Sequence, residues 1–565
     1  ISFIKNVIKI FPLLNPLKSR ATIYSLCALV LVIVFPIIMV PVNVIGGKTI
    51  ESMARRDTLM FIVYCSSILV VFFLMGTLQG LMKYFINLTS IEWRKNVTNK
   101  MSKKYFENNM YYKLLQMDRE IDNTDQRLTQ DIDGLTNSFG LNPGLASLLF
   151  MPITTIMLTF VTLLQISISI HWLIGVGIII PICILSLLQL IAIVIKSKYV
   201  YRQEKFEGYF RFQLVRLKKY SEQIAFYGGR NREYGIVLKK FQDVISNQYK
   251  LVFIEVLVNS GGQFIQNMSG AIAFIAVIVA SKITNMGNDG YAIAGKVTEI
   301  ISSCSSLSAL LGVTLLLAGN IGYISGLLNR IGQMHDQMKS IETKYEQDPM
   351  LVNQNDQEIV LEDLTVVTPK NRTLAQQLNI SLNGNSSDHL LITGPSGCGK
   401  SSILRVMAGL WPFKEGFLSK PSNFEMMFVP QKPYLIYGSL RQQLFYPDAT
   451  CMKSDSELMY ILKEVNLGYL VDRMGSFSTV RDYACVLSPG EQQRISFARI
   501  LYHQPKFAIL DESTSALDFE NEQAMYDLLF KKYKITMISV GHRETIHHFH
   551  KYQLALEHDN SWKLY

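Results

Sequence analysis

The sequence predicts a protein of two parts: an all-helical membrane domain with six spans, followed by a soluble α/β domain with a phosphate-binding P-loop. The first observation is composition, since 49% of the 565 residues are hydrophobic and only 18% are charged, against about 25% charged in typical soluble domains. The second is that long uncharged segments concentrate in residues 1–330, and the third is a P-loop motif at 394–401. Together they exclude a disordered, collagen-like or disulfide-scaffold protein and argue against a wholly soluble enzyme.

Six segments are long and apolar enough to cross a bilayer, which requires about 20 consecutive apolar residues. The clearest pair lies between Gly134 and Ile195, where there is no Asp, Glu, Lys or Arg. Buried core helices are the alternative interpretation, but they are typically much shorter. The predicted spans are residues 21–45, 58–82, 144–168, 170–195, 251–283 and 300–327.

The connections between the spans predict the orientation of the chain. Two long polar stretches, 83–143 and 196–250, carry most of the Lys and Arg of the membrane half, and a basic excess marks the cytosolic side of a membrane. We therefore expect both stretches and both chain ends in the cytosol, with the membrane helices continuing into them. The net charge of +10 is then explained without nucleic acid, for which the sequence has no motif.

The domain boundaries follow from the change in composition. Residues 1–340 form the predicted transmembrane domain, the polar and acidic stretch 341–357 the linker, and residues 358–565 the soluble α/β domain. The seven cysteines are scattered, with no CxxC pair and no histidine at zinc spacing, so neither a disulfide framework nor a zinc site is expected. The sequence begins with Ile, and we expect the native chain to carry residues before it.

A phosphate-binding loop is predicted where the apolar run 390–393 meets the segment 394–401, which matches GxxxxGK[ST] and opens a helix. Its glycines allow backbone N–H groups to surround phosphates at a helix N-terminus, where the dipole favours an anion. Lys400 is expected to reach the β- and γ-phosphates of ATP, and Ser401 to bind Mg²⁺. The candidate ATP-binding residues here are Gly394, Pro395, Ser396, Gly397, Cys398, Gly399, Lys400, Ser401 and Ser402.

A second motif for phosphate chemistry ends the apolar run 507–510 with two adjacent carboxylates, Asp511 and Glu512. A buried strand would deliver both to one edge of a sheet. Asp511 is predicted to hold Mg²⁺, and Glu512 to polarise the attacking water as the general base. Taken alone, the pair could equally be an acidic cap after a strand.

The third motif is LSPGEQQR at residues 487–494, a short polar turn that opens a helix. It resembles the signature of ABC-transporter ATPases, and the resemblance extends from residue 358 to the C-terminus. It implies an ABC ATPase domain in which Ser488 and Gly490 contact the γ-phosphate of ATP and Glu491 belongs to the same binding segment. Pro489 departs from this family's pattern, which usually has Gly there.

Further elements of the ABC family occur in family order. Gln431 matches the Q-loop, which implies a third Mg²⁺ contact beside Ser401 and Asp511. Residues 515–518 match the D-loop, which ends at Asp518, and His542 matches the switch histidine at the γ-phosphate. The resemblance therefore implies Glu512, His542 and Lys400 as catalytic residues. Residues 364–369 offer no aromatic side chain to stack on adenine, which leaves adenine recognition unassigned.

Six spans followed by one ATPase domain resemble a half-transporter, in which ATP is bound between the P-loop of one subunit and the signature of the other. The resemblance therefore implies an obligate dimer, with itself or with a second half-transporter. Several segments of the membrane half resemble subfamily D, which contains peroxisomal fatty-acyl-CoA transporters and a lysosomal member linked to cobalamin. These segments are residues 92–94, 111–112, 122–131 and 221–229, although Thr124 and Gln223 depart from the subfamily's usual Pro and Glu.

The subfamily implies an ATP-driven, Mg²⁺-dependent translocase for a small lipid-like molecule in an organelle membrane, with its ATPase domain in the cytosol. We expect a fatty acyl-CoA as substrate and the peroxisome as the location. Residues 203–205 and 210–212 look more like the lysosomal member, so transport of the cobalamin type stays open. A scaffold or channel role within a membrane complex stays open as well.

Two groups of residues in the membrane half carry further expectations. Lys83, Lys196 and Lys198 lie at the predicted cytosolic ends of spans and could bind the phosphates of an acyl-CoA, although interface anchoring is the simpler role. Three apolar residues, Ile224, Phe226 and Tyr227, lie on an otherwise polar loop. They could pack within that loop, but we expect them to dock onto the ATPase domain of the partner subunit.

Overall fold

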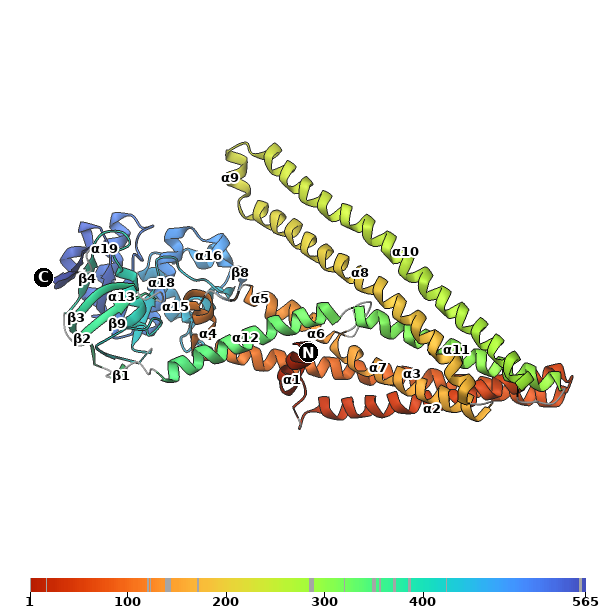
Figure 1. Cartoon of the computed structure of the whole chain (residues 1–565). Coiled ribbons are helices and arrows are strands. Elements are labelled where there is room, and N and C mark those ends of the chain that lie inside the picture. Colours follow the sequence, from red (N-terminus) through yellow and green to blue (C-terminus); the bar gives the residue numbers. More distant parts are fainter. Residues whose placement is uncertain are drawn as a thin grey trace. The chain divides into compact units, whose positions relative to one another are not determined.

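The structure of the protein is a computed structural model (Figure 1). It describes residues 2–16, 18–118, 121, 123–137, 144–169, 172–283, 289–319, 321–347, 352–354, 357–368, 372–384, 388–422, 424–557 and 561–565. The chain forms two compact units. The helical unit comprises Ile1–Glu107 and Ile121–Met338, and the α/β unit comprises Asn108–Glu120 and Lys339–Tyr565.

The helical unit is built from long helices connected by short segments. Its principal helices are α1 (Ser2–Leu14), α2 (Arg20–Ala54), α3 (Thr58–Phe106), α7 (Leu145–Ser169), α8 (Trp172–Lys219), α10 (Arg230–Ile283), α11 (Gly290–Gly319) and α12 (Ile321–Gln347). Its short elements are α5 (Thr124–Gln126), the π-helix Arg127–Asp131, α6 (Ile132–Thr136) and α9 (Ser221–Phe226). Asp122 and residues 138–143 of the predicted long loop lie outside the described residues.

Within the described residues, five helices are long and apolar enough to cross a membrane: Arg20–Ala54, Thr58–Gln116, Leu145–Ile168, Val176–Lys219 and Gly290–Thr314. The predicted fifth span, 251–283, lies in the second half of α10 and is not among them, so a sixth span stays a prediction. The apolar helix Gly290–Thr314 begins before the predicted last span, 300–327, and includes the charged residues Lys296 and Glu299. The bounds of that span stay a prediction.

Glu299 fits inside a membrane helix because a buried polar network receives its carboxylate. Gln165 Nε2 donates to Glu299 Oε1 at 2.9 Å, and Ser303 Oγ donates to Gln165 Oε1 at 3.2 Å. Asn43 Nδ2 donates to Ser303 Oγ at 3.0 Å, and Ser302 Oγ donates to Asn43 Oδ1 at 2.8 Å. Buried polar groups need such partners, and these partners join α2, α7 and α11.

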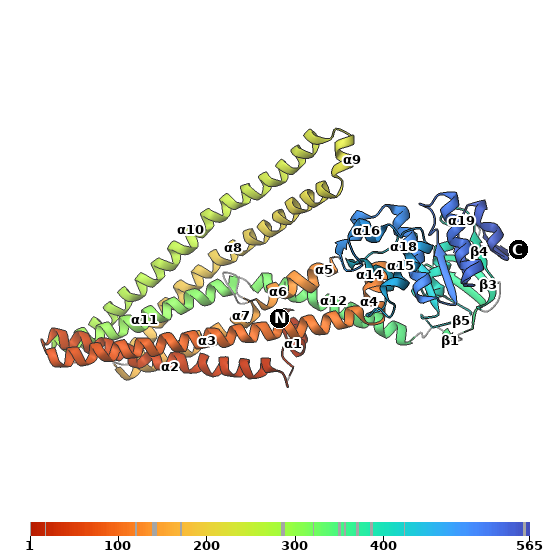
Figure 2. The ribbon, with the colours of Figure 1, turned by 180° about the vertical axis from the view of Figure 1, so that it is seen from behind.

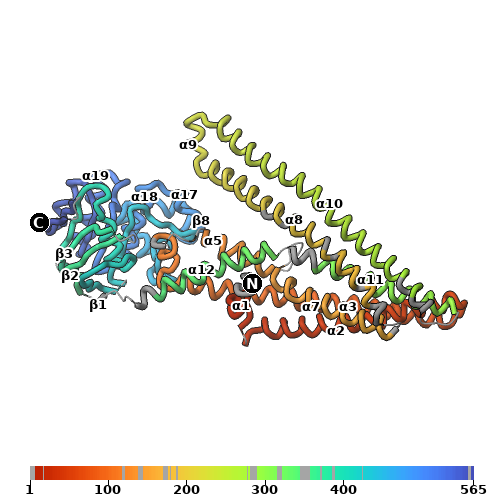
Figure 3. Tube along the Cα trace, in the orientation of Figure 1, coloured from red at the N-terminus to blue at the C-terminus, as the bar shows by residue number. Residues whose placement is uncertain are grey.

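Helices α8 and α10 form a long antiparallel pair joined by α9, and they run side by side in both views and in the tube trace (Figures 1, 2 and 3). α8 passes without a break from its apolar first half into a basic second half. Two polar contacts join the middle parts of these helices: Lys196 pairs with Glu255 at 2.9 Å, and Asn247 Nδ2 donates to Gln203 Oε1 at 2.9 Å.

The α/β unit contains a six-stranded sheet of order β12-β11-β4-β10-β9-β6, a four-stranded sheet of order β1-β5-β2-β3 and the antiparallel pair β7-β8. In the larger sheet β11, β4, β10, β9 and β6 are parallel neighbours. The strands are β1 (Val352–Gln354), β2 (Glu358–Val367), β3 (Thr373–Asn383), β4 (Leu390–Thr393), β5 (Phe417–Lys420), β6 (Met426–Val429), β7 (Tyr437–Ser439), β8 (Val480–Asp482), β9 (Phe507–Asp511), β10 (Thr536–Val540), β11 (Tyr552–Leu556) and β12 (Trp562–Leu564).

The α/β unit also contains helices, several of which bury apolar residues against the strands. They are α4 (Met110–Tyr112), α13 (Lys400–Met407), α14 (Leu440–Phe445), α15 (Asp455–Glu464), α16 (Leu470–Met474), α17 (Tyr483–Val486), α18 (Pro489–His503) and α19 (Phe519–Asp527). A short 3₁₀ element, Glu107–Asn109, lies where the chain passes from the helical unit into this one, and further 3₁₀ and π elements lie at Lys113–Asp118, Leu528–Lys532 and Glu544–Phe549. Strands β9 and β10 are buried along almost their whole length, as parallel strands covered on both faces are.

One segment of the predicted membrane domain belongs to the α/β unit. Residues Asn108–Glu120, between α3 and α5, group with the C-terminal residues. The contact is specific, because Trp411 Nε1 donates to Tyr112 OH at 3.0 Å. No local pattern around Tyr112 predicts this partner, which lies 299 positions further along the chain.

Candidate functional site

The loop 394–399 between β4 and α13 has the conformation of a phosphate cradle. Gly394, Gly397 and Gly399 have φ values of 141°, 81° and 113°, which other residues rarely adopt. A Cβ on Gly394 would lie 2.5 Å from Leu556 O, so glycine is also required there by space. Lys400 is buried at the start of α13, and its Nζ donates to the carbonyls of Gly394 and Pro395 at 2.8 Å each.

Four neighbouring parallel strands bring the other predicted residues to the same edge of the sheet. The P-loop follows β4, His542 follows β10, Glu512 follows β9, and Gln431 follows β6. The carboxyl ends of parallel strands are where α/β proteins bind ligands. The sheet order therefore explains why motifs far apart in the sequence form one cluster.

A hydroxyl and a carboxylate meet at the start of α13. Ser401 Oγ donates to Asp511 Oδ1 at 3.0 Å. Burial raises the pKa of Asp511 and the charge of Glu512 adds to this, while the Ser401 hydrogen bond and the charges of Arg405 and Lys400 oppose it. Oxygen donors of this kind are those that Mg²⁺ prefers, so the residues present fit that ion.

Glu512 is held at the centre of the cluster. Its φ of +47° places it in the left-handed region, a strained conformation that is common at functional sites. Its backbone N–H donates to Val540 O at 3.0 Å, which ties it to β10. Gln431 Nε2 donates to Glu512 Oε2 at 2.7 Å, and His542 Nε2 lies 3.7 Å from Glu512 Oε1. The carboxylate is thus oriented from both sides.

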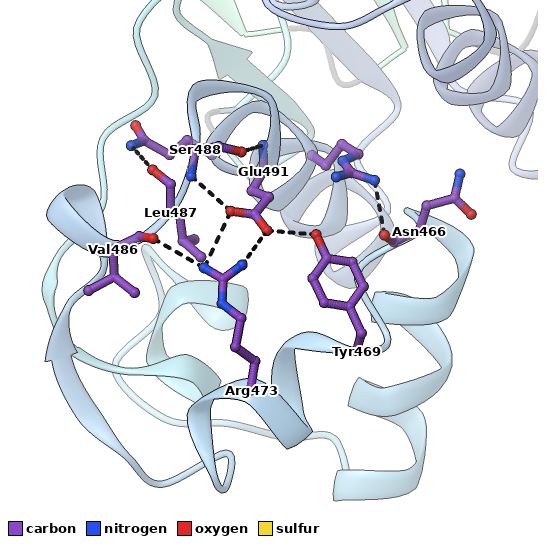
Figure 4. A network of polar contacts seen from close by, with 9 residues as sticks. Asn466, Tyr469, Arg473, Val486, Leu487, Ser488 and Glu491 are labelled. Carbon is purple, nitrogen blue, oxygen red and sulfur yellow. Dashed lines mark hydrogen bonds and ion pairs between the residues drawn. The ribbon is translucent and has the colours of Figure 1, made fainter.

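The signature residues form a second cluster (Figure 4). Ser488 is the N-cap of α18, where its Oγ accepts from Glu491 N at 3.3 Å and its own N–H donates to Glu491 Oε2 at 2.8 Å. Glu491 Oε1 also accepts from Tyr469 OH at 2.6 Å and from Arg473 Nη1 at 2.7 Å. Burial would raise the pKa of Glu491, but the bonds from Tyr469, Ser488 and Arg473 together lower it.

The D-loop connects the two clusters through side chains that sequence reasoning missed. Gln493 of α18 donates to Ser515 Oγ at 3.1 Å and accepts from Ala516 N at 2.9 Å. Arg543, next to His542, donates to the carbonyls of Ser515 and Leu517 at 3.1 Å each. The D-loop is therefore anchored both to the signature helix and to the loop that carries His542.

The predicted ATP-binding residue Asp518 lies at the end of the D-loop. It caps α19 by accepting from Asn521 N at 2.8 Å, and this bond is the first of the causes that lower the pKa of Asp518. The structure thus gives Asp518 a part in starting α19, and its contact with ATP stays a prediction.

The structure divides the predicted site residues into two groups. Lys400, Ser401, Gln431, Asp511, Glu512 and His542 lie together at the sheet edge, while Ser488, Gly490 and Glu491 lie at the start of α18. Tyr469 and Arg473 are the additional residues of the second group. Their spacing of four places an aromatic and a basic side chain on one helical face, but nothing in the sequence connects them to Glu491.

A P-loop, two carboxylates at a parallel-strand edge and a capped signature helix define a nucleotide-hydrolysing domain, here on the same chain as apolar helices of membrane-spanning length. Comparison with known proteins identifies the family. The family model for "ABC transporter transmembrane region 2" matches residues 10–281, and the model for "ABC transporter" matches residues 377–515. The chain belongs to the ABC transporter family, as a half-transporter of subfamily D.

Three relatives illustrate the similarity. An uncharacterized ABC transporter ATP-binding protein of Synechocystis sp. is 32% identical over 85% of this chain and 72% of its own length. ATP-binding cassette sub-family D member 3 of Homo sapiens is 28% identical over 91% and 81%, respectively. The chloroplastic ABC transporter D family member 2 of Arabidopsis thaliana is 28% identical over 93% and 83%. The predictions of a helical membrane domain followed by an ABC ATPase domain, and of an ATPase coupled to transport, are confirmed.

Proposed function

We propose that this chain is one half of a dimeric ATP-driven transporter that moves a fatty acyl-CoA or a related lipid across an organelle membrane, most simply that of the peroxisome. The observation that supports the dimer is the division of the site. Each chain has one P-loop cluster and one signature cluster, and among the described residues Ser488 bonds to neighbours in its own helix, α18. Two chains arranged head to tail would complete two ATP sites.

Each residue of the P-loop cluster has a role in this proposal. The backbone N–H groups of 394–399 and Lys400 bind the phosphates of ATP. Ser401, Asp511 and Gln431 hold Mg²⁺, which supplies charge stabilisation at the β- and γ-phosphates. Glu512 accepts a proton from the attacking water, and Gln431 orients its carboxylate. His542 contacts the γ-phosphate, and the signature segment of the partner subunit closes the site.

The raised pKa of Asp511 supports this assignment. A buried carboxylate beside a second carboxylate is costly to keep ionised, and a divalent cation would remove that cost. Two acidic groups at hydrogen-bonding distance from Ser401 and Gln431 are therefore better explained as a cation site than as a cap after a strand.

The exposed aromatic residues at α9 support a dimer independently. The side chains of Phe226 and Tyr227 are 82% and 90% exposed, at the turn between two long helices. Exposed aromatic residues next to one another favour a protein contact. We assign this contact to the ATPase domain of the partner subunit, which would move with nucleotide and carry that motion into α8 and α10.

The substrate assignment rests on the subfamily and on basic residues beside the spans. Lys83 and Lys198 are exposed, whereas Lys196 forms an ion pair with Glu255. Lys83 and Lys198 are therefore the better candidates for binding the phosphates of a CoA group. Cobalamin-type transport and a scaffold or channel role are the competing functions.

The test uses the full-length protein purified and reconstituted in liposomes. We expect its ATPase activity to rise with long-chain acyl-CoA and not with cobalamin. Glu512→Gln should reduce turnover by about 10²–10⁴, the usual contribution of a general base, while ATP binding is retained. In a heterodimer of a Lys400→Ala subunit and a Ser488→Arg subunit, one ATP site combines the changed P-loop with the changed signature. The other site combines the two unchanged segments, so the heterodimer should keep measurable hydrolysis.

Three outcomes would contradict the proposal. Wild-type turnover by Glu512→Gln would remove the assigned base. Stimulation by cobalamin alone would replace the substrate class. Hydrolysis by each homodimeric variant, Lys400→Ala and Ser488→Arg, at the wild-type rate would exclude the shared site.

A further inference from the structure

The N-terminus of α18 carries a buried acidic side chain at the place where the proposed function requires an anion to bind. Glu491 is in the first turn of the helix and is only 6% exposed. A carboxylate at this position stabilises a helix through its dipole and its free N–H groups. The same negative charge would repel the phosphates of ATP that the proposed function brings to Ser488.

The basic side chain that contacts the Glu491 carboxylate in the network of Figure 4 is Arg473. Arg473 faces the carboxylate with two nitrogens, Nη1 at 2.7 Å from Oε1 and Nη2 at 3.5 Å from Oε2. A further bond from Nη2 to Val486 O at 3.1 Å fixes the guanidinium. Tyr469 OH, at 2.6 Å, is a neutral donor to the same carboxylate.

The backbone already provides the geometry of the helix start. Ser488 and Glu491 form a reciprocal capping box. A glutamine in place of Glu491 can accept the same bond from the Ser488 N–H. The side chain at 491 could therefore be neutral without loss of the cap. Arg473 does not take part in the capping box itself, so its contribution is separable from helix formation.

We propose that Arg473 is a positioning residue that keeps the N-terminus of α18 receptive to phosphate by neutralising Glu491. The inference rests on the proposed role of Ser488 at the partner's ATP. Arg473 acts through Glu491 and does not touch the nucleotide. Without Arg473, Glu491 remains as a fixed negative charge beside the phosphates.

The experiment compares Arg473→Gln with the double variant Arg473→Gln/Glu491→Gln in the full-length reconstituted dimer. Arg473→Gln should raise the KM for ATP by about tenfold or more, because like charges brought together weaken binding strongly. The double variant should recover most of that loss, because it removes the repelling charge and keeps a capping side chain. Raising the ionic strength should lessen the defect of Arg473→Gln by screening.

Controls separate charge from folding. Arg441 forms an ion pair with Asp455 in the same unit, at 2.6 Å, so Arg441→Gln removes a comparable pair and should leave the KM unchanged. Arg473→Lys, which retains the charge, should fall between wild type and Arg473→Gln. If Arg473→Gln lowers the unfolding midpoint, the KM values for ATP of Arg473→Lys and of the double variant still test the role of charge. The first variant keeps the neutralising charge, and the second removes the charge that Arg473 neutralises.

A double variant no better than Arg473→Gln, or a wild-type KM in Arg473→Gln, would overturn the inference. Failure of the proposed function is recognised separately, by wild-type ATPase activity in the Ser488→Arg and Lys400→Ala homodimers. If those two variants are inactive and Arg473→Gln is normal, only the role of Arg473 is rejected.

Discussion

The hydrogen bond between Trp411 and Tyr112 offers the most direct test of how a loop between membrane helices reaches the ATPase site. Tyr112 ends α4, and Asn108 and Asn109 before it have left-handed φ values of 50° and 54° that turn the chain out of α3. Trp411 Nε1 donates to Tyr112 OH at 3.0 Å. This hydrogen bond thus joins the segment Asn108–Glu120 to the ATPase domain.

The contact continues toward the nucleotide site. The Arg405 guanidinium lies over the Trp411 ring, 4.9 Å from its centroid. Arg405 is in the last turn of α13, the helix that begins with Lys400 and Ser401. Its positive charge is one of the influences that lower the pKa of Asp511. A shift of Tyr112 would therefore displace a ring and a charge close to the proposed Mg²⁺ ligands.

Tyr112→Phe removes the acceptor and leaves the Trp411 N–H without this partner. An unsatisfied, partly buried donor costs about 1–3 kcal/mol, which corresponds to roughly a 5- to 150-fold change in the docking equilibrium of the loop. We expect the ratio of substrate-stimulated to basal ATPase activity to fall toward one, with the affinity for ATP little changed. Trp411→Phe, which lacks the donor but keeps a ring under Arg405, should show the same loss.

Tyr460→Phe is the matched control, because Tyr460 OH accepts a bond from the exposed Lys532 and has no part in this loop. Its ratio of substrate-stimulated to basal ATPase activity should equal that of the wild type. The double variant Tyr112→Phe/Trp411→Phe should be no worse than either single variant, since both remove one bond. A normal stimulation ratio in Tyr112→Phe, with folded protein, would refute the reasoning and direct attention to α9 as the route of coupling.

Two further predictions concern stability, measured as the unfolding midpoint of the full chain in detergent. Gly47→Val should destabilise the helical unit by about 1–3 kcal/mol through overpacking, because a Cβ on Gly47 would lie 2.6 Å from Gly295 O. Gly46→Val is the control, because a Cβ on Gly46 would meet open space. Equal unfolding midpoints for the two variants would contradict the close packing of α2 on α11. Glu522→Ala should cost about 1–3 kcal/mol, because buried Glu522 accepts from Thr514 and Thr545 and the buried Thr514 hydroxyl would lose this partner. Exposed Glu520, also in the first turn of α19, should tolerate the change to Ala, and an equal loss in both would contradict the role of burial.

The features that could be predicted from the sequence are those that are local in the chain. Residues 394–401 are a contiguous motif whose glycines allow only a few backbone conformations, so the P-loop is recognisable from these residues alone. Asp511 and Glu512 directly follow a short apolar run that forms a buried strand, and they are recognisable for the same reason. The four strands that carry these motifs are neighbours in the sheet, and this order could be expected only through the resemblance to a family.

Pairing across distance could not be predicted from the sequence. Arg473 and Glu491 are 18 positions apart, and Trp411 and Tyr112 are 299 positions apart, with no periodicity to connect them. Glu299 in α11 shows the same limit, because in the sequence a charged residue argues against a membrane helix, whereas Gln165 on another helix donates a hydrogen bond to it in the interior. Tertiary hydrogen bonds decide such cases, and they have no signature in composition.

The loops of the site are connected in a way that bears on how two composite sites would communicate. Arg543 is adjacent to His542 and holds the D-loop through the carbonyls of Ser515 and Leu517. The same D-loop is bound by Gln493, five residues after Ser488. In the proposed dimer, His542 faces the ATP of its own P-loop, and Ser488 faces the ATP of the partner. A displacement of His542 on hydrolysis would therefore reach the other site through side chains of one subunit, without passing through the membrane helices.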